Sequence, residues 1–392
     1  MTNSVRSIQY RIRHRLGGSK VSIRDGADCF TLEQLWAGTP SYRKCRSRGD
    51  HHTEVVAPEG DTARTRHRSS PSRFDITEGR PMTTDISEKS STAPAGAAGQ
   101  DVLRDLYADW SEIMATTPEL TIRLLRALFD EWHQPTVEPE DVTYREDTVG
   151  GVPGIWCLPQ GADESKVLLY THGGGFAVGS AASHRKLAGH VAKALGAVSF
   201  VLDYRRAPEF QHPAQIEDGV AAFDALVANG IAPQDITTIG DSAGGNLAVA
   251  IALALREQGK QGPGSVIAFS PWLDMENKGE TLATNNDTDA LITPELLEGM
   301  IAGVLGDTID PKTPLANPLH ADFAGFPRMY ITAGSVESLL DNATRLEKLA
   351  ASAGVDVTLS IGEGQQHVYP FLAGRSALVD DEFAKLAAWY QK

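Results

Sequence analysis

The chain has 392 residues, of which 41% are hydrophobic and 22% charged, with a net charge of −15, as in an ordinary globular protein of one or two domains. No run approaches the ~18 apolar residues that a membrane span needs, and the start "MTNSVRSIQYRIRHRLGG" lacks the apolar core of a secretory signal. The three cysteines (Cys29, Cys45 and Cys157) form no metal or redox motif, so we expect a reduced, cytoplasmic setting.

The first 81 residues differ in charge from the rest of the chain. They contain 15 Lys and Arg against 9 Asp and Glu, a net charge of +6, which leaves −21 for residues 82–392. Because this basic segment has no helical or alternating apolar pattern, we expect residues 1–98 to form a disordered extension and linker. The acidic remainder argues against a nucleic-acid partner.

Two kinds of pattern follow the linker. Between residues 101 and 133 apolar side chains such as Leu103, Tyr107 and Trp110 recur at helical spacing, which predicts two amphipathic helices. The stretch "VTYREDTVGGVPGIWCLP" (142–159) then alternates and turns as an antiparallel hairpin does.

From residue 166 onwards, predicted strands alternate with predicted helices. The strands are 166–171, 198–204, 236–241, 265–270, 328–333 and 355–361, and the helices are 184–195, 215–229, 244–258, 342–354 and 376–390. This alternation predicts a mostly parallel sheet covered by helices on both faces. The segment 274–322 breaks the rhythm with polar loops and one helix near 294–305, so we expect an insertion over the carboxyl edge of the sheet, where such proteins bind ligands.

The stretch "TTIGDSAGGNLAV" (237–249) places Ser242 between the end of a strand and the start of a helix. Gly240, Ser242 and Gly244 spell the Gly-x-Ser-x-Gly pattern of a nucleophile elbow. Such an elbow holds the serine hydroxyl clear of the sheet, at the positive end of a helix. A plain strand–turn–helix with small residues for packing is the alternative reading.

A glycine-rich loop, "THGGGFAVGS" (171–180), follows an earlier strand. Successive glycines allow backbone amides to approach a ligand closely, and an oxyanion formed during acyl transfer needs such donors. Gly173, Gly174 and Gly175, together with the amide of Ala243 after the serine, are the candidate oxyanion hole, with Gly174 and Gly175 favoured within the loop. The loop lacks the spacing of a phosphate-binding motif.

Together with "DYRRAPEFQHPAQIED" (203–218) between them, these two motifs make the chain from about residue 100 onwards resemble the hormone-sensitive-lipase family of α/β-hydrolases. The resemblance implies a mostly parallel sheet of eight strands, a helical cap from residues 99–135, and a catalytic domain over 136–392 with a cap insertion at about 275–322. It further implies a carboxylesterase or lipase acting on small-molecule esters without a metal or other cofactor, in which His172 braces the oxyanion loop. The sequence does not fix the oligomeric state, and it allows a homodimer.

The catalytic base follows from the order serine, acid, histidine in this fold. Only His320 and His367 follow Ser242, and His320 lies in the proline-rich insertion. His367 lies in "GEGQQHVYPF", a loop after the last predicted strand, and is the predicted base. We treat His184, His190, His212 and His320 as ordinary histidines.

The acid is less sharply defined by the sequence. The family commonly has Asp-Pro-Leu-x-Asp after the penultimate strand, whereas this chain has "AGSVESLLDNA" (333–343), whose register places Glu337 at the first acid and Asp341 at the second. Glu337 is the predicted acid, because Asp341 resembles the N-cap of the next helix. Asp341 and Asp274 remain the alternatives.

These residues predict ester hydrolysis through a Ser242–Glu337–His367 triad and an acyl-enzyme, on short- to medium-chain acyl esters. A lactonase, amidase or acetyl-hydrolase on the same scaffold is an open alternative. So is a non-catalytic small-molecule binding protein, although receptors of this fold lack the histidine that this chain retains.

Overall fold

The computed structural model describes residues 22–25, 28–31 and 100–392, which belong to two separate units, Met1–Ser72 and Arg73–Lys392. In the first unit, β1 (Ser22–Asp25) pairs antiparallel with β2 (Asp28–Thr31). This pair was not predicted from the sequence. The rest of the disordered extension predicted over residues 1–98 lies outside the described residues.

The second unit is built on one sheet of eight strands in the order β10-β9-β8-β7-β5-β6-β4-β3. Strands β5 to β10 run parallel, whereas β3 and β4 are antiparallel to their neighbours. The strands are β3 (Val142–Val149), β4 (Val152–Pro159), β5 (Asp163–Thr171), β6 (Ala197–Leu202), β7 (Ile236–Asp241), β8 (Ser265–Phe269), β9 (Arg328–Gly334) and β10 (Val357–Gly362). The predicted eight-stranded, mostly parallel sheet is confirmed.

The predicted hairpin is the pair β3 and β4. Its two turn residues, Gly150 and Gly151, have φ angles of 62° and 82°. A tight two-residue hairpin turn of this kind needs positive φ at both positions, which glycine adopts without strain.

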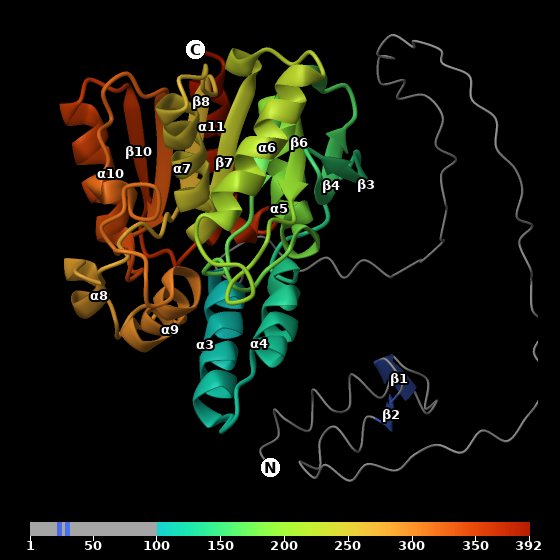
Figure 1. Ribbon diagram of the computed structural model, residues 1–392, viewed down its shortest axis with the longest axis vertical. Helices are drawn as coiled ribbons and strands as arrows, with labels where there is room; N and C mark the ends of the chain where they lie inside the picture. Colours follow the sequence, from blue (N-terminus) through green and yellow to red (C-terminus); the bar gives the residue numbers. More distant parts are fainter. Residues whose placement is uncertain (1–21, 26–27, 32–99) are drawn as a thin grey trace, which may run out of the picture. The chain divides into compact units, whose positions relative to one another are not determined.

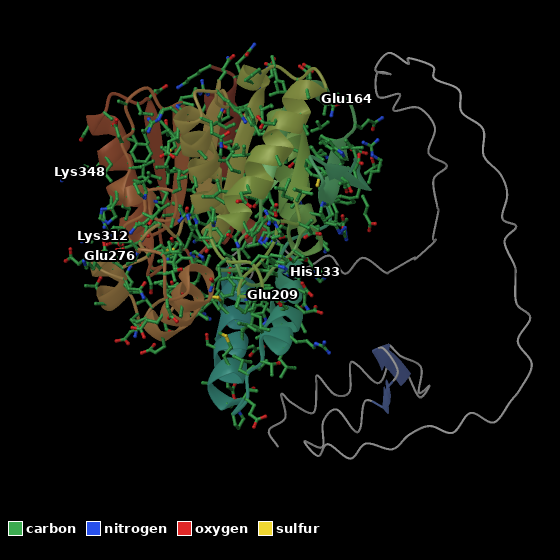
Figure 2. The ribbon with its side chains drawn as sticks, in the orientation of Figure 1. His133, Glu164, Glu209, Glu276, Lys312 and Lys348 are labelled. Carbon is green, nitrogen blue, oxygen red and sulfur yellow. The ribbon has the colours of Figure 1, made fainter. Side chains whose placement is uncertain are left out.

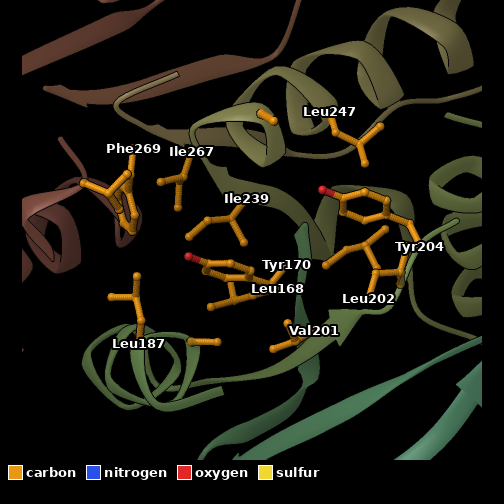
Figure 3. Packing of buried hydrophobic residues seen from close by; sticks show 14 of the residues in the cluster. Leu168, Tyr170, Leu187, Val201, Leu202, Tyr204, Ile239, Leu247, Ile267 and Phe269 are labelled. Atoms are coloured by element: carbon orange, nitrogen blue, oxygen red, sulfur yellow. The ribbon is translucent and has the colours of Figure 1, made fainter. Parts of the chain in front are cut away.

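Helices cover both faces of this sheet, as predicted. Figure 1 shows α6 (Ala214–Ala228), α7 (Ala243–Glu257) and α10 (Leu340–Ser352) in front of the strands, with α5 (Ala181–Leu195) and α11 (Ala377–Tyr390) behind them. The strands contribute fully buried side chains such as Leu168 and Ile239. Figure 3 shows these side chains between Leu247 of α7 and Leu187 of α5, so the parallel strands pack on both faces.

The two helices predicted between residues 101 and 133 are α3 (Gln100–Thr116) and α4 (Ile122–Phe129), followed by the 3₁₀ turn η1 (Asp130–His133). Figure 1 shows α3 and α4 side by side at the end of the sheet near α8 (Glu280–Thr284) and α9 (Pro294–Leu305). The helix predicted near 294–305 is confirmed by α9. No helix in the described part of the chain has the length and apolar character needed to cross a membrane.

Aromatic rings attach α3 and α4 to the body of the protein. Trp132 stacks on Phe371 with ring centroids 5.2 Å apart and lies edge-on to Trp110 and Phe129. A second attachment is polar: Arg126 on α4 makes two hydrogen bonds of 2.8 and 2.6 Å with the Glu209 carboxylate. Figure 2 shows Glu209 where α4 meets the body. Such contacts fix both helices over one edge of the sheet.

Candidate active site

Ser242 lies in the sharp bend between β7 and α7. Its φ of 53° and ψ of −122° are strained values for a residue with a side chain. Neighbouring segments hold this conformation, because the Ser242 amide donates to the Phe269 carbonyl (2.8 Å) and the Trp272 amide donates to the Ser242 carbonyl (3.0 Å). The Ser242 hydroxyl has no hydrogen-bond partner among the described residues.

The glycines on either side of Ser242 are required by close backbone approach. A Cβ atom at Gly240 would lie 2.3 Å from the Gly244 carbonyl oxygen, and one at Gly244 would lie 2.0 Å from the Thr171 carbonyl oxygen. Both distances are too short for any side chain. The elbow therefore packs directly against the end of β5, where the glycine loop begins.

In the glycine loop, the three amides have different surroundings. The Gly173 amide is 3.2 Å from both the Asp241 carboxylate and Nε2 of His184, so it already has acceptors. The amides of Gly174 and Gly175 have none among the described residues, and the same holds for Ala243 at the start of α7. Both loop residues have positive φ, 114° and 58°. Three unpaired donors therefore lie on the two segments that flank Ser242.

His172 is fully buried at the base of this loop. Its Nδ1 donates to the Gly173 carbonyl (2.7 Å), and its ring stacks on Tyr204 at 4.2 Å between centroids. The Tyr204 hydroxyl in turn donates to the His172 carbonyl (2.7 Å). Burial, with His184 nearby, lowers the pKa of His172 well below its usual value, so the ring is neutral. His172 therefore contacts the glycine loop directly, and its bracing role stays a prediction.

A second set of buried residues supports the glycine loop and was not predicted from the sequence. Asp241 is fully buried and accepts hydrogen bonds from the Tyr170 hydroxyl (2.8 Å) and the Gly173 amide. His184, which we had treated as ordinary, is also fully buried with Nε2 3.3 Å from Asp241. Asp241 adjoins Ser242 within the elbow motif, which was the available signal. Nothing in the sequence linked His184 to it.

The other histidines treated as ordinary lie away from these contacts. His190 bonds the Val137 carbonyl (2.8 Å), and His320 bonds Glu276 (2.8 Å) at the surface. His212 lines a small cavity of about 10 Å³ together with Phe176, Asn246, Leu247, Met275 and Val304, among others. This cavity lies between Phe176, next to the glycine loop, and α7, which begins directly after Ser242.

Glu337 and His367 meet beyond the ends of β9 and β10. The Oε1 atom of Glu337 is 3.7 Å from Nδ1 of His367, and both side chains are fully buried. Burial alone would lower the pKa of His367, but Glu337, with Asp289 and Asp241 as more distant charges, holds that pKa above its usual value. Nε2 of His367 is buried and has no hydrogen-bond partner among the described residues.

Both alternative acids have other partners. Asp341 accepts from the Glu280 amide (2.7 Å), so it caps α8 and is not the N-cap of its own helix, which is Leu339. Asp274 pairs with Arg345 (2.7 Å) and accepts from the amides of Glu276 and Lys278. Neither forms an ion pair with His367.

Known proteins resemble this chain in sequence. Residues 168–371 match a protein family described as alpha/beta hydrolase fold. An acetyl-hydrolase of Streptomyces hygroscopicus is 38% identical over an alignment of 271 positions, which covers 64% of this chain and 89% of that protein. An esterase of Acinetobacter venetianus is 34% identical over 66% of this chain and 88% of its own length.

Solved structures of esterases and lipases also resemble this chain. An esterase from the bacterial hormone-sensitive lipase family superposes with a TM-score of 0.71 at 36% identity, over 76% of this chain and 99% of that one. A hormone-sensitive lipase from a metagenome library gives 0.71 at 32% identity, over 76% and 98%. The chain therefore belongs to the α/β-hydrolase fold family as a bacterial carboxylesterase of the hormone-sensitive-lipase type, a carboxylic ester hydrolase.

Proposed function

We propose that the protein is a serine carboxylesterase that hydrolyses esters of short acyl chains through Ser242, His367 and Glu337. The buried pairing of Glu337 with His367, at the sheet edge where the Ser242 elbow also lies, carries this proposal. In this fold the carboxyl ends of parallel strands meet at one edge, so residues after β7, β9 and β10 can act on one substrate.

The chemistry follows from the unpaired groups. Nε2 of His367 takes the proton of the Ser242 hydroxyl as the oxygen attacks the ester carbonyl, and Glu337 stabilises the resulting imidazolium. The amides of Gly174, Gly175 and Ala243 bind the oxyanion, because the Gly173 amide is already bonded. His367 then protonates the leaving alcohol, and water releases the acyl group by the same route.

The helices α3 and α4, within residues 99–135, and the insertion at about 275–322 form the cap over this site. A small cavity beside Phe176, Met275 and Val304 lies between this insertion and α7, and it has room for about one water molecule. The acetyl-hydrolase named among the relatives favours short acyl groups. The substrate partner is a small-molecule ester.

A substrate panel with one variant tests the proposal. We expect wild-type protein to cleave p-nitrophenyl acetate and butyrate faster than longer chains, an anilide or a lactone. Ser242→Ala should reduce kcat by about 10⁴-fold or more and abolish labelling by a fluorophosphonate. Ser265→Ala, a buried serine at the far end of β8, is the matched control. Near-wild-type turnover by Ser242→Ala would refute the assignment, and a preference for the anilide or lactone would change the substrate class.

A further inference from the structure

We propose that Tyr107 and Ser270 are positioning residues that clamp the peptide group between His367 and Val368, so that helix α3 and the segment directly after strand β8 together set the orientation of the base. This inference rests on the proposed role of His367. It assigns a function to two buried hydroxyl groups that the mechanism above does not use.

The carbonyl end of this peptide group is held from the cap. Tyr107 on α3 is fully buried, and its hydroxyl donates to the His367 carbonyl at 3.0 Å across 260 residues of sequence. The same hydroxyl accepts a hydrogen bond from Nε1 of Trp132 (3.0 Å). Burial raises the pKa of Tyr107 well above its usual value, so the hydroxyl remains a neutral donor.

The amide end of the same peptide group is held from the sheet. Ser270, fully buried directly after β8, accepts a hydrogen bond from the Val368 amide (3.0 Å). Its hydroxyl donates to Oε2 of Glu337 (2.7 Å). Ser270 is thus bonded both to the acid and to the residue that follows the base.

Backbone strain explains why a clamp is needed. Val368 has φ 50° and ψ 48°, a left-handed conformation that a β-branched residue rarely adopts. Ser270 has a φ of 44°, and its own amide is fixed by the Thr332 carbonyl (2.6 Å). Such conformations persist only where the surroundings over-determine them, and here each polar atom of the peptide group has a partner on a different element.

The clamp matters because the acid–base contact is long. The 3.7 Å between Glu337 and His367 exceeds a hydrogen bond, so a small rotation about this peptide group decides whether the pair engages. Because Tyr107, which holds the carbonyl end of the peptide group, lies on α3, the position of the cap and the orientation of the imidazole are coupled.

The experiment compares Tyr107→Phe and Ser270→Ala with wild type in kcat, KM and rate of fluorophosphonate labelling. We expect each variant to lose about tenfold or more in kcat with KM within about twofold, because the transition state alone needs the aligned base. The acid limb of the kcat–pH profile should move to lower pH, since a looser pair raises the pKa of His367 less. In a Glu337→Gln background, Tyr107→Phe should have less than about a twofold effect.

Matched controls separate positioning from packing. Tyr330→Phe removes another buried tyrosine hydrogen bond, to Glu382, and Ser265→Ala removes a buried hydroxyl at the opposite end of β8. Both should keep kcat. Ser270→Gly relieves the positive φ but still lacks the hydroxyl, so it should resemble Ser270→Ala. If Tyr107→Phe does not fold, Trp132→Phe removes the partner hydrogen bond and should show the same kcat loss and pH shift.

The outcomes are distinguishable. Wild-type protein that is not labelled at Ser242 would overturn the proposed function itself. The clamp alone would be overturned if wild-type protein is labelled but the folded Tyr107→Phe and Ser270→Ala variants keep the wild-type kcat. The same holds if only KM changes in these variants. The clamp would also be overturned if Tyr107→Phe lowers kcat as much in the Glu337→Gln background as it does in the wild-type protein.

Discussion

Glu337 faces His367 at 3.7 Å in a region where both side chains are fully buried. A charge in such surroundings interacts more strongly than it would in water. Burial opposes the imidazolium and the carboxylate favours it, and the carboxylate prevails, so the pKa of His367 lies above its usual value. The protonation state of one buried imidazole should therefore govern activity.

The first prediction concerns pH. We expect kcat/KM to increase with pH through the raised pKa of His367, because the protonated imidazole cannot accept the Ser242 proton. In Glu337→Gln the raising charge is absent and burial remains, so the residual activity should have its acid limb at lower pH. Profiles of both proteins with p-nitrophenyl acetate measure this, and an unmoved limb would show that another group titrates.

The acid can be assigned by three substitutions. Glu337→Gln should lower kcat by about 10³- to 10⁴-fold, as loss of a triad acid does elsewhere. Asp341→Asn and Asp274→Asn should stay within about threefold of wild type, because their carboxylates cap α8 and pair with Arg345. Unfolding curves establish that all three fold. A severe loss in Asp341→Asn with normal activity in Glu337→Gln would move the acid to Asp341.

The sequence predicted most of the framework because its signals are local. Strand β7 was predicted at the residues where it lies, 236–241, since β-branched residues end there in a Gly-Asp-Ser turn. Strand β5 begins at Asp163, three residues earlier than predicted, because its pairing with β6 shifts register between Asp163 and Val167. No local pattern reports such an irregularity.

Support for the site was harder to predict because its partners are distant in sequence. His184 is 57 residues from Asp241, and Tyr107 is 260 from His367. The choice among the three glycine amides depends on which of them Asp241 binds, and this depends on tertiary structure. Motifs predicted the candidate reacting groups, whereas the residues that contact them depend on tertiary structure.

The bonded state of Gly173 gives a third prediction. A Cβ atom at this position would lie 2.2 Å from Oδ2 of Asp241, so Gly173→Ala should displace the loop and reduce kcat by about 100-fold, the loss typical of one oxyanion donor. Gly262→Ala is the control, since its Cβ would meet nothing within 4 Å. Activity within a few-fold of wild type in folded Gly173→Ala would mean that Asp241 does not hold the loop in its active form.

The cavity beside Phe176 gives the last prediction. Val304 on α9 is buried and lines this cavity, so Val304→Ala should enlarge it and raise kcat/KM for p-nitrophenyl hexanoate relative to acetate by about tenfold, the typical effect of one methylene in an apolar pocket. Val249→Ala makes the same truncation in a separate part of the core. Both variants should lose about 1–3 kcal/mol of stability, but only Val304→Ala should change the chain-length ratio. An equal ratio in the two variants would place the acyl group elsewhere under the cap.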